Sequence, residues 1–321
     1  MEVIYDRTAG IALGGSVVTI GAYDGIHLGH RAIMESLKNL AKTHSVPSVV
    51  VTFDRHPATV VRPTSAPKLI TDLESRLELL EGLGIDYVYL IEFDTVRATE
   101  SAGDFVDQVL VAALGAKAVM VGSDFHFGHN REGTVEFLAK RGSELGFVVQ
   151  GIELVKVGSL PSTTPALSGV PISSTLIRSL IAEGDVRQAS VLLGRDHCIR
   201  GMVSSGDRRG GGLLGFPTAN VEPPGQMAIP ADGIYAGHLR ILPDRESVKA
   251  AISVGTRPTF YPTGGPRLIE SYLLDFSGDL YSQAVEITFN SFIRPQVTFS
   301  DSQALVAQIE LDVLAIREAL G

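Results

Sequence analysis

From residue 16 to about residue 155, short apolar runs alternate with stretches that have the periodicity of amphipathic helices. Because these strand-like runs are apolar throughout, the alternation predicts a doubly wound parallel sheet that is covered by helices on both faces. Ligands of such sheets bind at the carboxyl ends of the strands. The predicted strands are 17–20, 48–53, 87–93, 118–122 and 147–154, and the predicted helices lie near 28–44, 71–82, 101–114 and 133–145.

The pattern changes in the second half of the chain. Helical stretches that end near Gly184 and Gly194 are followed by strand-like runs with Gly and Pro turns, which predict an antiparallel barrel or sandwich. A last helix is expected at about 300–320, with Ser300 and Gln303 as a capping box at its start. We place a boundary near 186, so that 1–186 and 187–321 form two domains. The strand-like runs include 233–242, 250–254, 269–276 and 284–292.

Composition excludes several classes of protein. The formal net charge of −9 argues against general nucleic-acid binding, which needs a basic surface. No run of 18 apolar residues and no secretory signal pattern is found, so we expect a cytoplasmic protein without a membrane span. The single cysteine, Cys198, excludes an internal disulfide and is expected to be a buried small residue rather than a nucleophile. Association into a homo-oligomer is left open.

The segment Gly21-Ala-Tyr-Asp-Gly-Ile-His-Leu-Gly-His30 connects the first predicted strand to the first predicted helix. The backbone N–H groups and the dipole at a helix start favour anions, above all phosphate. Residues at i and i+3 share a helix face, so His27 and His30 should project to the same side. The segment is therefore a candidate site for the phosphates of a nucleotide.

Two other interpretations of these histidines stay open. They could be surface polar groups near an ordinary glycine-rich turn, because short motifs have many false matches. They could also bind a metal ion, although helical zinc pairs usually lie at i and i+4 with a glutamate between them. Here the spacing is three residues, and Leu28 and Gly29 lie between the histidines.

Two further segments contain residues that could bind a ligand. In Ile172-Ser-Ser-Thr-Leu-Ile-Arg178, the residues from Ser173 to Thr175 can cap a helix and offer hydroxyls to phosphate, and Arg178 lies one turn further on. The alternative is a plain N-cap with a surface arginine. In 121–128, Asp124, Phe125 and Phe127 follow a predicted strand; they are either pocket residues or a turn with core phenylalanines.

A third candidate site lies in the second half. Residues 206–215 contain five glycines and two arginines, which suits a flexible cationic loop that closes over phosphates, or else a plain turn. Phe216-Pro-Thr-Ala-Asn220 follows directly, and Thr218 and Asn220 offer the hard oxygen ligands that Mg²⁺ prefers. A carboxylate within hydrogen-bond reach can act as a general base, and Glu270 is the candidate; the alternative is a solvent-facing strand residue.

The first segment resembles the nucleotidyltransferase signature of the bacterial bifunctional riboflavin kinase/FAD synthetase family, which more often has Phe at the position of Tyr23. The Ile172–Arg178 and 121–128 segments resemble further motifs of that family. The resemblance implies that ATP is bound by Gly21, Tyr23, Asp24, Gly29, Ser173, Ser174 and Thr175. It implies as catalytic residues His27 and His30, which would stabilise the developing charge, and Arg178, which would hold the leaving group together with Ser174 and Thr175. It also implies a flavin and nucleotide pocket formed by Asp124, Phe125 and Phe127.

The second half resembles the riboflavin kinases of the same family through Gly-Phe-Pro-Thr-Ala-Asn, which ends at Asn220. This resemblance implies that Thr218 and Asn220 serve Mg²⁺ and ATP, that Glu270 is the general base, and that Arg294 lies near the flavin. It also implies an ATP phosphate loop formed by Gly206, Arg208, Arg209, Gly210, Gly215 and Pro217.

Taken together, the resemblance covers about residues 16 to 318. It implies an enzyme that phosphorylates riboflavin to FMN and adenylates FMN to FAD, with ATP and Mg²⁺. Positioning and charge stabilisation suffice for adenylyl transfer, so no covalent nucleophile is required. One rival is a riboflavin kinase with a weakened adenylyltransferase, because the lead-in 168–171 lacks a basic residue that the family often has. Other rivals are a flavin-binding module without turnover and a transferase for another phosphorylated substrate.

Overall fold

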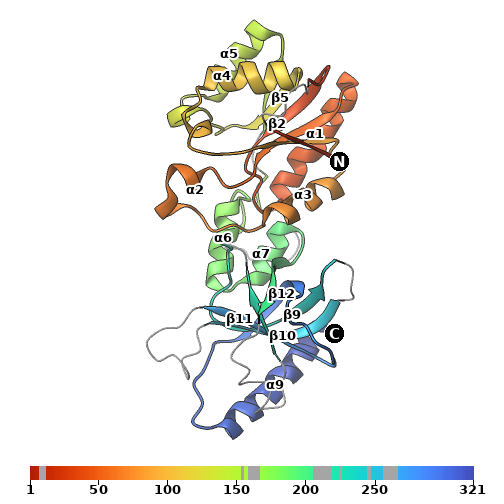
Figure 1. The fold of residues 1–321 in the computed structure, drawn as a ribbon, viewed down its shortest axis with the longest axis vertical. Coiled ribbons are helices and arrows are strands. Elements are labelled where there is room, and N and C mark those ends of the chain that lie inside the picture. The colour runs from red at the N-terminus through yellow and green to blue at the C-terminus, as the bar shows by residue number, and fades with distance from the viewer. Residues whose placement is uncertain are drawn as a thin grey trace. The chain divides into compact units, whose positions relative to one another are not determined.

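The computed structural model describes residues 1–6, 12–152, 155–157, 167–204, 218–223, 226–243, 247–255 and 267–321. The chain forms two compact units (Figure 1). The first comprises 1–69, 73–159 and 169–172, and the second comprises 70–72, 160–168 and 173–321. Among the described residues, no helix combines the length and the hydrophobicity needed to cross a membrane.

The first unit contains a six-stranded parallel sheet with the strand order β1-β4-β3-β2-β5-β6. Its strands are β1 (Glu2–Tyr5), β2 (Ser16–Ile20), β3 (Ser48–Phe53), β4 (Tyr87–Ile91), β5 (Ala116–Gly122) and β6 (Val148–Ile152). Its helices are α1 (Leu28–His44), α2 (Ala58–Val61), α3 (Leu73–Gly82), α4 (Ala102–Phe105) and α5 (Val135–Leu145), with the π-helical η3 (Val106–Ala113) and the short 3-10 helices η1 (Pro63–Ser65), η2 (Arg97–Thr99) and η4 (His129–Arg131).

Both faces of this sheet are buried, which explains why its strands are apolar throughout. Val18 and Ile20 of β2 pack in one core cluster with side chains of η3 and α5. Val17, on the opposite face, packs with Met34 of α1 and Leu80 of α3. Figure 1 accordingly shows α1 and α3 on one side of the sheet, and α4 and α5 on the other. The predicted doubly wound architecture is confirmed.

The order of the strands locates the point where ligands bind in such a sheet. The chain runs from β2 to β3 and β4 on one side, and then returns to place β5 on the other side of β2. The connections after β2 and β5 therefore diverge to opposite faces of the sheet and leave a crevice at its carboxyl edge. Because β2 and β5 are parallel neighbours, with Thr19 paired to Met120, the turn from Gly21 and the loop from Gly122 both start at this crevice.

The second unit contains a closed antiparallel barrel with the strand order β10-β11-β8-β7-β12-β9. The prediction that left a barrel or a sandwich open is thereby resolved as a barrel. Its interior is filled by apolar side chains such as Tyr235, Ile252 and Phe289. The strands are β7 (His197–Ser204), β8 (Thr218–Glu222), β9 (Gly233–Ile241), β10 (Ser247–Gly255), β11 (Leu268–Leu273) and β12 (Ala284–Arg294), and the helices are α6 (Ser174–Glu183), α7 (Val186–Leu193) and α9 (Ser302–Leu320).

Most predicted elements are confirmed, with three corrections. The strand β1, at the edge of the sheet, is missing from the prediction because only Ile4 of its four residues is buried. The predicted helix 101–114 is a short α-helix that continues as the π-helical η3. The capping box at Ser300 is wrong: the side chain of Asp301 accepts the hydrogen bond from the Ala304 N–H, so the cap lies one residue later.

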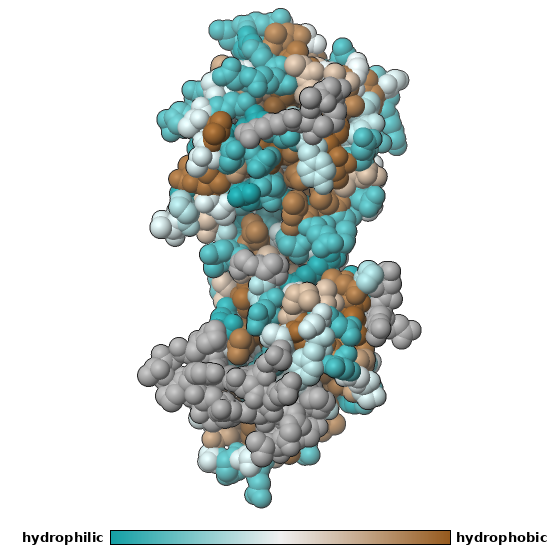
Figure 2. All heavy atoms as spheres, viewed as in Figure 1, coloured by the Kyte–Doolittle hydropathy of each residue, from teal (hydrophilic) through white to brown (hydrophobic). Residues whose placement is uncertain are grey.

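Large apolar side chains also reach the surface, where Figure 2 shows hydrophobic residues among hydrophilic ones in both units. Apolar atoms normally make up more than half of a protein surface, so scattered exposed residues of this kind are ordinary. Cys198, on β7, is only partly buried, yet desolvation raises the pKa of its thiol to about 12. It therefore stays protonated at neutral pH, as expected for a cysteine that is not a nucleophile.

Candidate active sites

The turn after β2 brings its two histidines into contact. The rings of His27 and His30 stack with their centroids 3.6 Å apart and their planes at 20°. The Tyr23 ring meets the His30 ring edge-on at 5.1 Å. The prediction that both histidines project to the same side is confirmed, and the pair lies at the carboxyl edge of the sheet, next to the crevice between β2 and β5.

His27 is also the N-cap of α1, because its Nδ1 accepts a hydrogen bond of 3.3 Å from the backbone N–H of His30. A ring nitrogen that accepts this bond carries no proton, so in this arrangement the proton of a neutral His27 lies on Nε2. The cap fixes the ring's orientation and leaves Nε2 as its donor. It also uses one of the N–H groups that the sequence suggested for phosphate.

The backbone of this turn adopts left-handed conformations at residues that rarely do so. The φ angles are 47° at Tyr23 and 40° at Ile26. Gly25, between them, also has a positive φ of 89°, which is ordinary for glycine. A β-branched residue such as isoleucine is a genuine outlier in this region, and such strain persists only where surrounding contacts over-determine the conformation. Ile26 is fully buried, which supplies part of that constraint.

Tyr23 anchors the turn to the sheet. Its hydroxyl lies 2.6 Å from Thr19 Oγ1, and Thr19 Oγ1 donates to the carbonyl oxygen of Met120 at 2.7 Å. Since the single Thr19 proton is used on Met120, Tyr23 is the donor in the first bond. Burial raises the pKa of the Tyr23 hydroxyl. Tyrosine in place of the more frequent Phe therefore adds a buried internal hydrogen bond to Thr19.

We expect Tyr23→Phe to lower the free energy of unfolding of the first unit by about 1 kcal/mol, because one internal hydrogen bond is lost while Thr19 keeps its bond to Met120. Urea denaturation followed by circular dichroism measures this loss. Thr43→Val is the control, since Thr43 only bonds the preceding turn of α1 at the surface. An unfolding free energy equal to that of the wild type would contradict the anchoring role.

Glycine at position 29 leaves room for the His27 ring. A Cβ at this position would lie 3.1 Å from His27 Nδ1 and Cε1, and 3.5 Å from the carbonyl oxygen of Ile172. These contacts show that Ile172, the first residue of the Ile172–Arg178 segment, lies beside the histidine turn within the first unit. Any side chain at this position would push against the ring that caps α1.

The loop after β5 contains the predicted pocket residues. Phe125 and Phe127 stack with centroids 5.4 Å apart, and Phe127 also contacts the rings of Phe105 and Phe137. Phe127 is therefore part of an aromatic cluster that fixes the loop. Asp124 is exposed at the strand end. Its place beside the crevice suits a ligand contact, which stays a prediction.

Ser173 is the N-cap of α6, where its Oγ accepts from the Leu176 N–H at 3.2 Å, as predicted. Ser174, Thr175 and Arg178 follow on the first turns of the helix. These four residues group with the second unit. Their contacts with ATP phosphate stay a prediction.

Residues 168–171, which precede Ile172, contain no basic residue, but Lys156 lies next to them in the structure. Lys156 and Pro171 are partners in an antiparallel bridge, flanked by backbone hydrogen bonds that join Val157 to Val170 and Ile172 to Val155. The exposed Lys156 side chain thus lies across from the lead-in of Ile172. This placement weakens the argument that the lead-in by itself implies a poor grip on phosphate.

In the barrel, the predicted kinase residues share one face. Glu270 of β11 pairs directly with Asn220 of β8, and Thr218 pairs with Tyr272. Ala219, between Thr218 and Asn220, and Ile269, next to Glu270, are buried in the barrel core, so the predicted residues lie on the outer face. Ser204 pairs with Asn220 and Ser253 pairs with Glu270, which extends the row of polar residues across four strands.

The other predicted kinase residues are the phosphate loop and Arg294. Gly206, Arg208, Arg209, Gly210, Gly215 and Pro217 lie outside the described residues. Arg294 at the end of β12 donates from Nε and Nη2 to Asp312 of α9, at 2.7 and 2.6 Å, and from Nη1 to Pro295. The guanidinium thus joins the barrel to α9. A flavin contact would have to compete with these bonds.

Sequence reasoning missed several residues of both sites. Ser204 and Ser253 are ordinary strand serines, and only the strand register reveals them. Thr19 is a polar residue in an apolar strand. Arg76, which donates to the carbonyl oxygen of Ala22 at the entry to the histidine turn, carried a usable signal, because it occupies an apolar-face position between Leu73 and Leu80 of α3.

Comparison with known proteins assigns a family model to each part of the chain. The chain matches a family model for FAD synthetase over residues 11–163 and one for riboflavin kinase over residues 193–320. A bifunctional riboflavin kinase/FMN adenylyltransferase of Escherichia coli K12 is 35% identical over 307 residues, which cover 96% of this chain and 93% of that protein. The protein of the same name from Pseudomonas fluorescens is 36% identical over 303 residues, which cover 94% and 92%.

A solved structure has the same fold over the whole chain. It is a crystal structure named as that of a macrolide-efflux protein from Streptococcus pneumoniae, with a TM-score of 0.80, 29% identity and 99% of each chain covered. The name macrolide-efflux protein belongs to that structure, and the similarity to this chain is one of fold. With two matched domain models and more than 30% identity over nearly all of both chains, this protein belongs to the family of bifunctional riboflavin kinases/FMN adenylyltransferases.

Proposed function

We propose that the chain phosphorylates riboflavin to FMN with ATP, and then adenylates FMN to FAD with a second ATP. Residues 187–321 would carry the first activity and residues 1–186 the second. The observation that carries this proposal is the pairing of Glu270 with Asn220 on the outer face of the barrel. It juxtaposes a carboxylate base and a hard oxygen ligand in a riboflavin kinase domain.

In the kinase reaction, the 5′-hydroxyl oxygen of riboflavin forms a bond to the γ-phosphorus of ATP. The bond from that phosphorus to the bridging oxygen breaks, and ADP leaves with the electron pair. Glu270 accepts the proton of the hydroxyl. The neighbouring row of Ser204, Asn220 and Ser253 offers hydroxyl and amide groups that can orient the phosphates and the flavin chain.

Thr218 and Asn220 fit a magnesium ion because they offer neutral oxygen ligands, although they are not part of a carboxylate cluster. Thr218 and Asn220, two residues apart, project from the same face of β8 and provide a hydroxyl and an amide oxygen. Among the described residues, no group of three His, Cys, Asp or Glu side chains is arranged to hold a metal. A bound Mg²⁺ would neutralise charge on the ATP phosphates, which would supply its remaining oxygen ligands.

In the adenylyl transfer, a phosphate oxygen of FMN bonds to the α-phosphorus of ATP, and the bond to the β-phosphate breaks with release of pyrophosphate. His27 offers its Nε2–H, and His30 lies stacked beside it, so both rings can stabilise the developing charge. Ser174, Thr175 and Arg178 would hold the leaving pyrophosphate. No step requires a covalent nucleophile.

Gly29→Ala should lower the rate of FAD formation by about tenfold, because a Cβ 3.1 Å from the His27 ring forces that ring to shift and misplaced catalytic groups are costly. FAD produced from supplied FMN measures this effect. Gly82→Ala is the matched control, since no atom lies within 4 Å of a Cβ there. A Gly29→Ala enzyme as fast as the wild type would contradict the role of ring orientation.

One product assay tests the whole proposal. The purified chain is incubated with riboflavin, ATP and Mg²⁺, and the flavins are separated by chromatography with time. We expect FMN first and FAD later. FMN without FAD would support a riboflavin kinase with an inactive adenylyltransferase domain, and bound riboflavin without ATP consumption would support a binding module.

A further inference from the structure

Arg76 is a buried arginine that the proposed chemistry does not use. It lies on α3, on the side of the helix that faces the sheet, and only 4% of it is exposed. A charged side chain is costly to bury unless its donors are bonded. The hydrogen bonds that its two terminal nitrogens donate therefore identify what the residue holds in place.

Two of these bonds go to backbone oxygens at the carboxyl edge of the sheet. Nη1 donates to the carbonyl oxygen of Ala22 at 2.8 Å, and Nη2 donates to that of Phe53 at 2.5 Å. Ala22 follows β2 and Phe53 ends β3, and these strands are parallel neighbours. The planar guanidinium thus links the ends of two adjacent strands with a fixed geometry.

Ala22 stands at the entry to the strained histidine turn. Its carbonyl oxygen also accepts from Thr52 Oγ1 at 3.3 Å, so two donors fix the orientation of the peptide group between Ala22 and Tyr23. Tyr23 has the first left-handed φ angle of the turn, followed by Gly25 and Ile26. Arg76 therefore supplies part of the constraint that this strained conformation needs.

We propose that Arg76 is a positioning residue for adenylyl transfer. It holds the Ala22 peptide, and through it the turn that presents His27 and His30, without touching the reacting phosphates. This inference rests on the proposed function for its kinetic test. It concerns how the histidines are held, and it adds no group to the chemistry itself.

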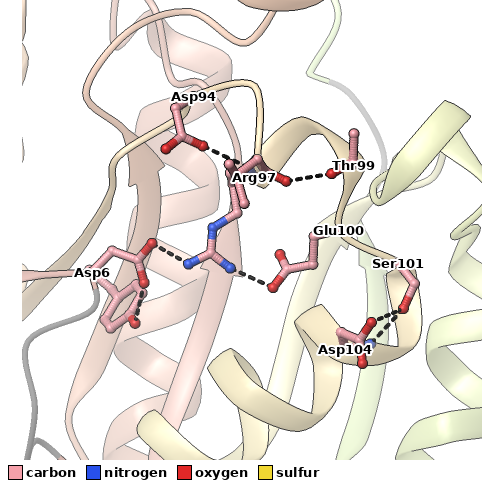
Figure 3. Close-up of polar contacts among 9 residues, drawn as sticks. Asp6, Asp94, Arg97, Thr99, Glu100, Ser101 and Asp104 are labelled. Carbon is pink, nitrogen blue, oxygen red and sulfur yellow. Dashed lines mark hydrogen bonds and ion pairs between the residues drawn. The ribbon is translucent and has the colours of Figure 1, made fainter.

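The kinetic test compares Arg76→Met, Arg76→Lys and Arg97→Met. Methionine fills the space without donors, whereas a lysine ammonium has three donors and can reach a carbonyl. Arg97 is the matched control, because it is a largely buried arginine of the same unit, with 9% of its side chain exposed, that binds Asp6 and Glu100 instead of the turn (Figure 3). Each variant is assayed well below its thermal midpoint, with FMN and ATP varied separately.

We expect Arg76→Met to lower kcat for FAD formation by about tenfold or more, with KM for FMN changed by less than about threefold. Arg76→Lys should recover most of that kcat. Riboflavin phosphorylation by the same preparations should be unchanged, which shows that the second unit is folded. Arg97→Met should lose thermal stability while keeping kcat within about threefold of wild type.

The inference is overturned if Arg76→Met keeps its kcat, or if Arg97→Met loses as much kcat at a similar loss of stability. A second measurement does not depend on turnover. In NMR spectra of the histidine rings, Arg76→Met should shift the signals of His27 and His30, and Arg97→Met should leave them in place. If the wild type made no FAD, the proposed function would fail, and these spectra would still decide whether Arg76 positions the turn.

Discussion

Replacing His30 by alanine is expected to lower FAD formation by about 10²–10³-fold, the usual cost of removing one group that stabilises transition-state charge. The substitution leaves the N-cap of α1 intact, because the cap uses the backbone N–H of His30, which alanine keeps. The start of the helix and the orientation of His27 should therefore survive. Only the stacked ring, 3.6 Å from that of His27, is lost.

The measurement is the rate of FAD formation from supplied FMN. His44→Ala is the matched control, because His44 is an exposed histidine at the other end of the same helix. Both variants should phosphorylate riboflavin at the rate of the wild type. A His30→Ala enzyme that retained FAD formation within about threefold of wild type would remove His30 from the mechanism.

The second large effect is expected in the other unit, where Glu270→Gln should slow riboflavin phosphorylation by about 10²–10⁴-fold. Glutamine keeps the shape of the side chain and cannot take the proton of the 5′-hydroxyl. Because the substituted side chain still faces Asn220 across the two strands, the barrel should stay folded. FAD formation from supplied FMN should be unaffected.

Phosphorylation of riboflavin is followed with ATP and Mg²⁺ in excess. Glu222→Gln serves as the control, since Glu222 is an exposed carboxylate on the same strand as Asn220. An equal decrease in both variants would indicate a general effect of charge on ATP binding. A Glu270→Gln enzyme with normal kcat would require another base.

Much of the fold could be predicted because its signals are local. The strand β3 and the helix α1 have the predicted bounds, since a run of five apolar or β-branched residues and a periodic helix face are read within one segment. The strand β1 gave no such signal, because it is short and pairs at the edge of the sheet with β4 only. Closure of the barrel depends on pairing between β12 and both β7 and β9, which no single segment encodes.

The sites divide in the same way. The sequence identified His27, His30 and Glu270 because residue type and spacing along the chain define those motifs. It did not show that His27 caps α1 or that Tyr23 points its hydroxyl at Thr19, since both depend on how the turn folds back. Arg294 was expected near a flavin, and its carboxylate partner is Asp312, 18 residues further on.

The sequence by itself determined the two-part architecture, the family resemblance and the residue types that can carry phosphoryl and adenylyl transfer. The tertiary structure decided which groups meet: the stacked histidines at the edge of the sheet, the polar row from Ser204 to Ser253, and the grip of Arg76 on Ala22. The physical reason is that hydrogen bonds and strand register join residues far apart in the chain, and their geometry is fixed only when the strands and helices pack together.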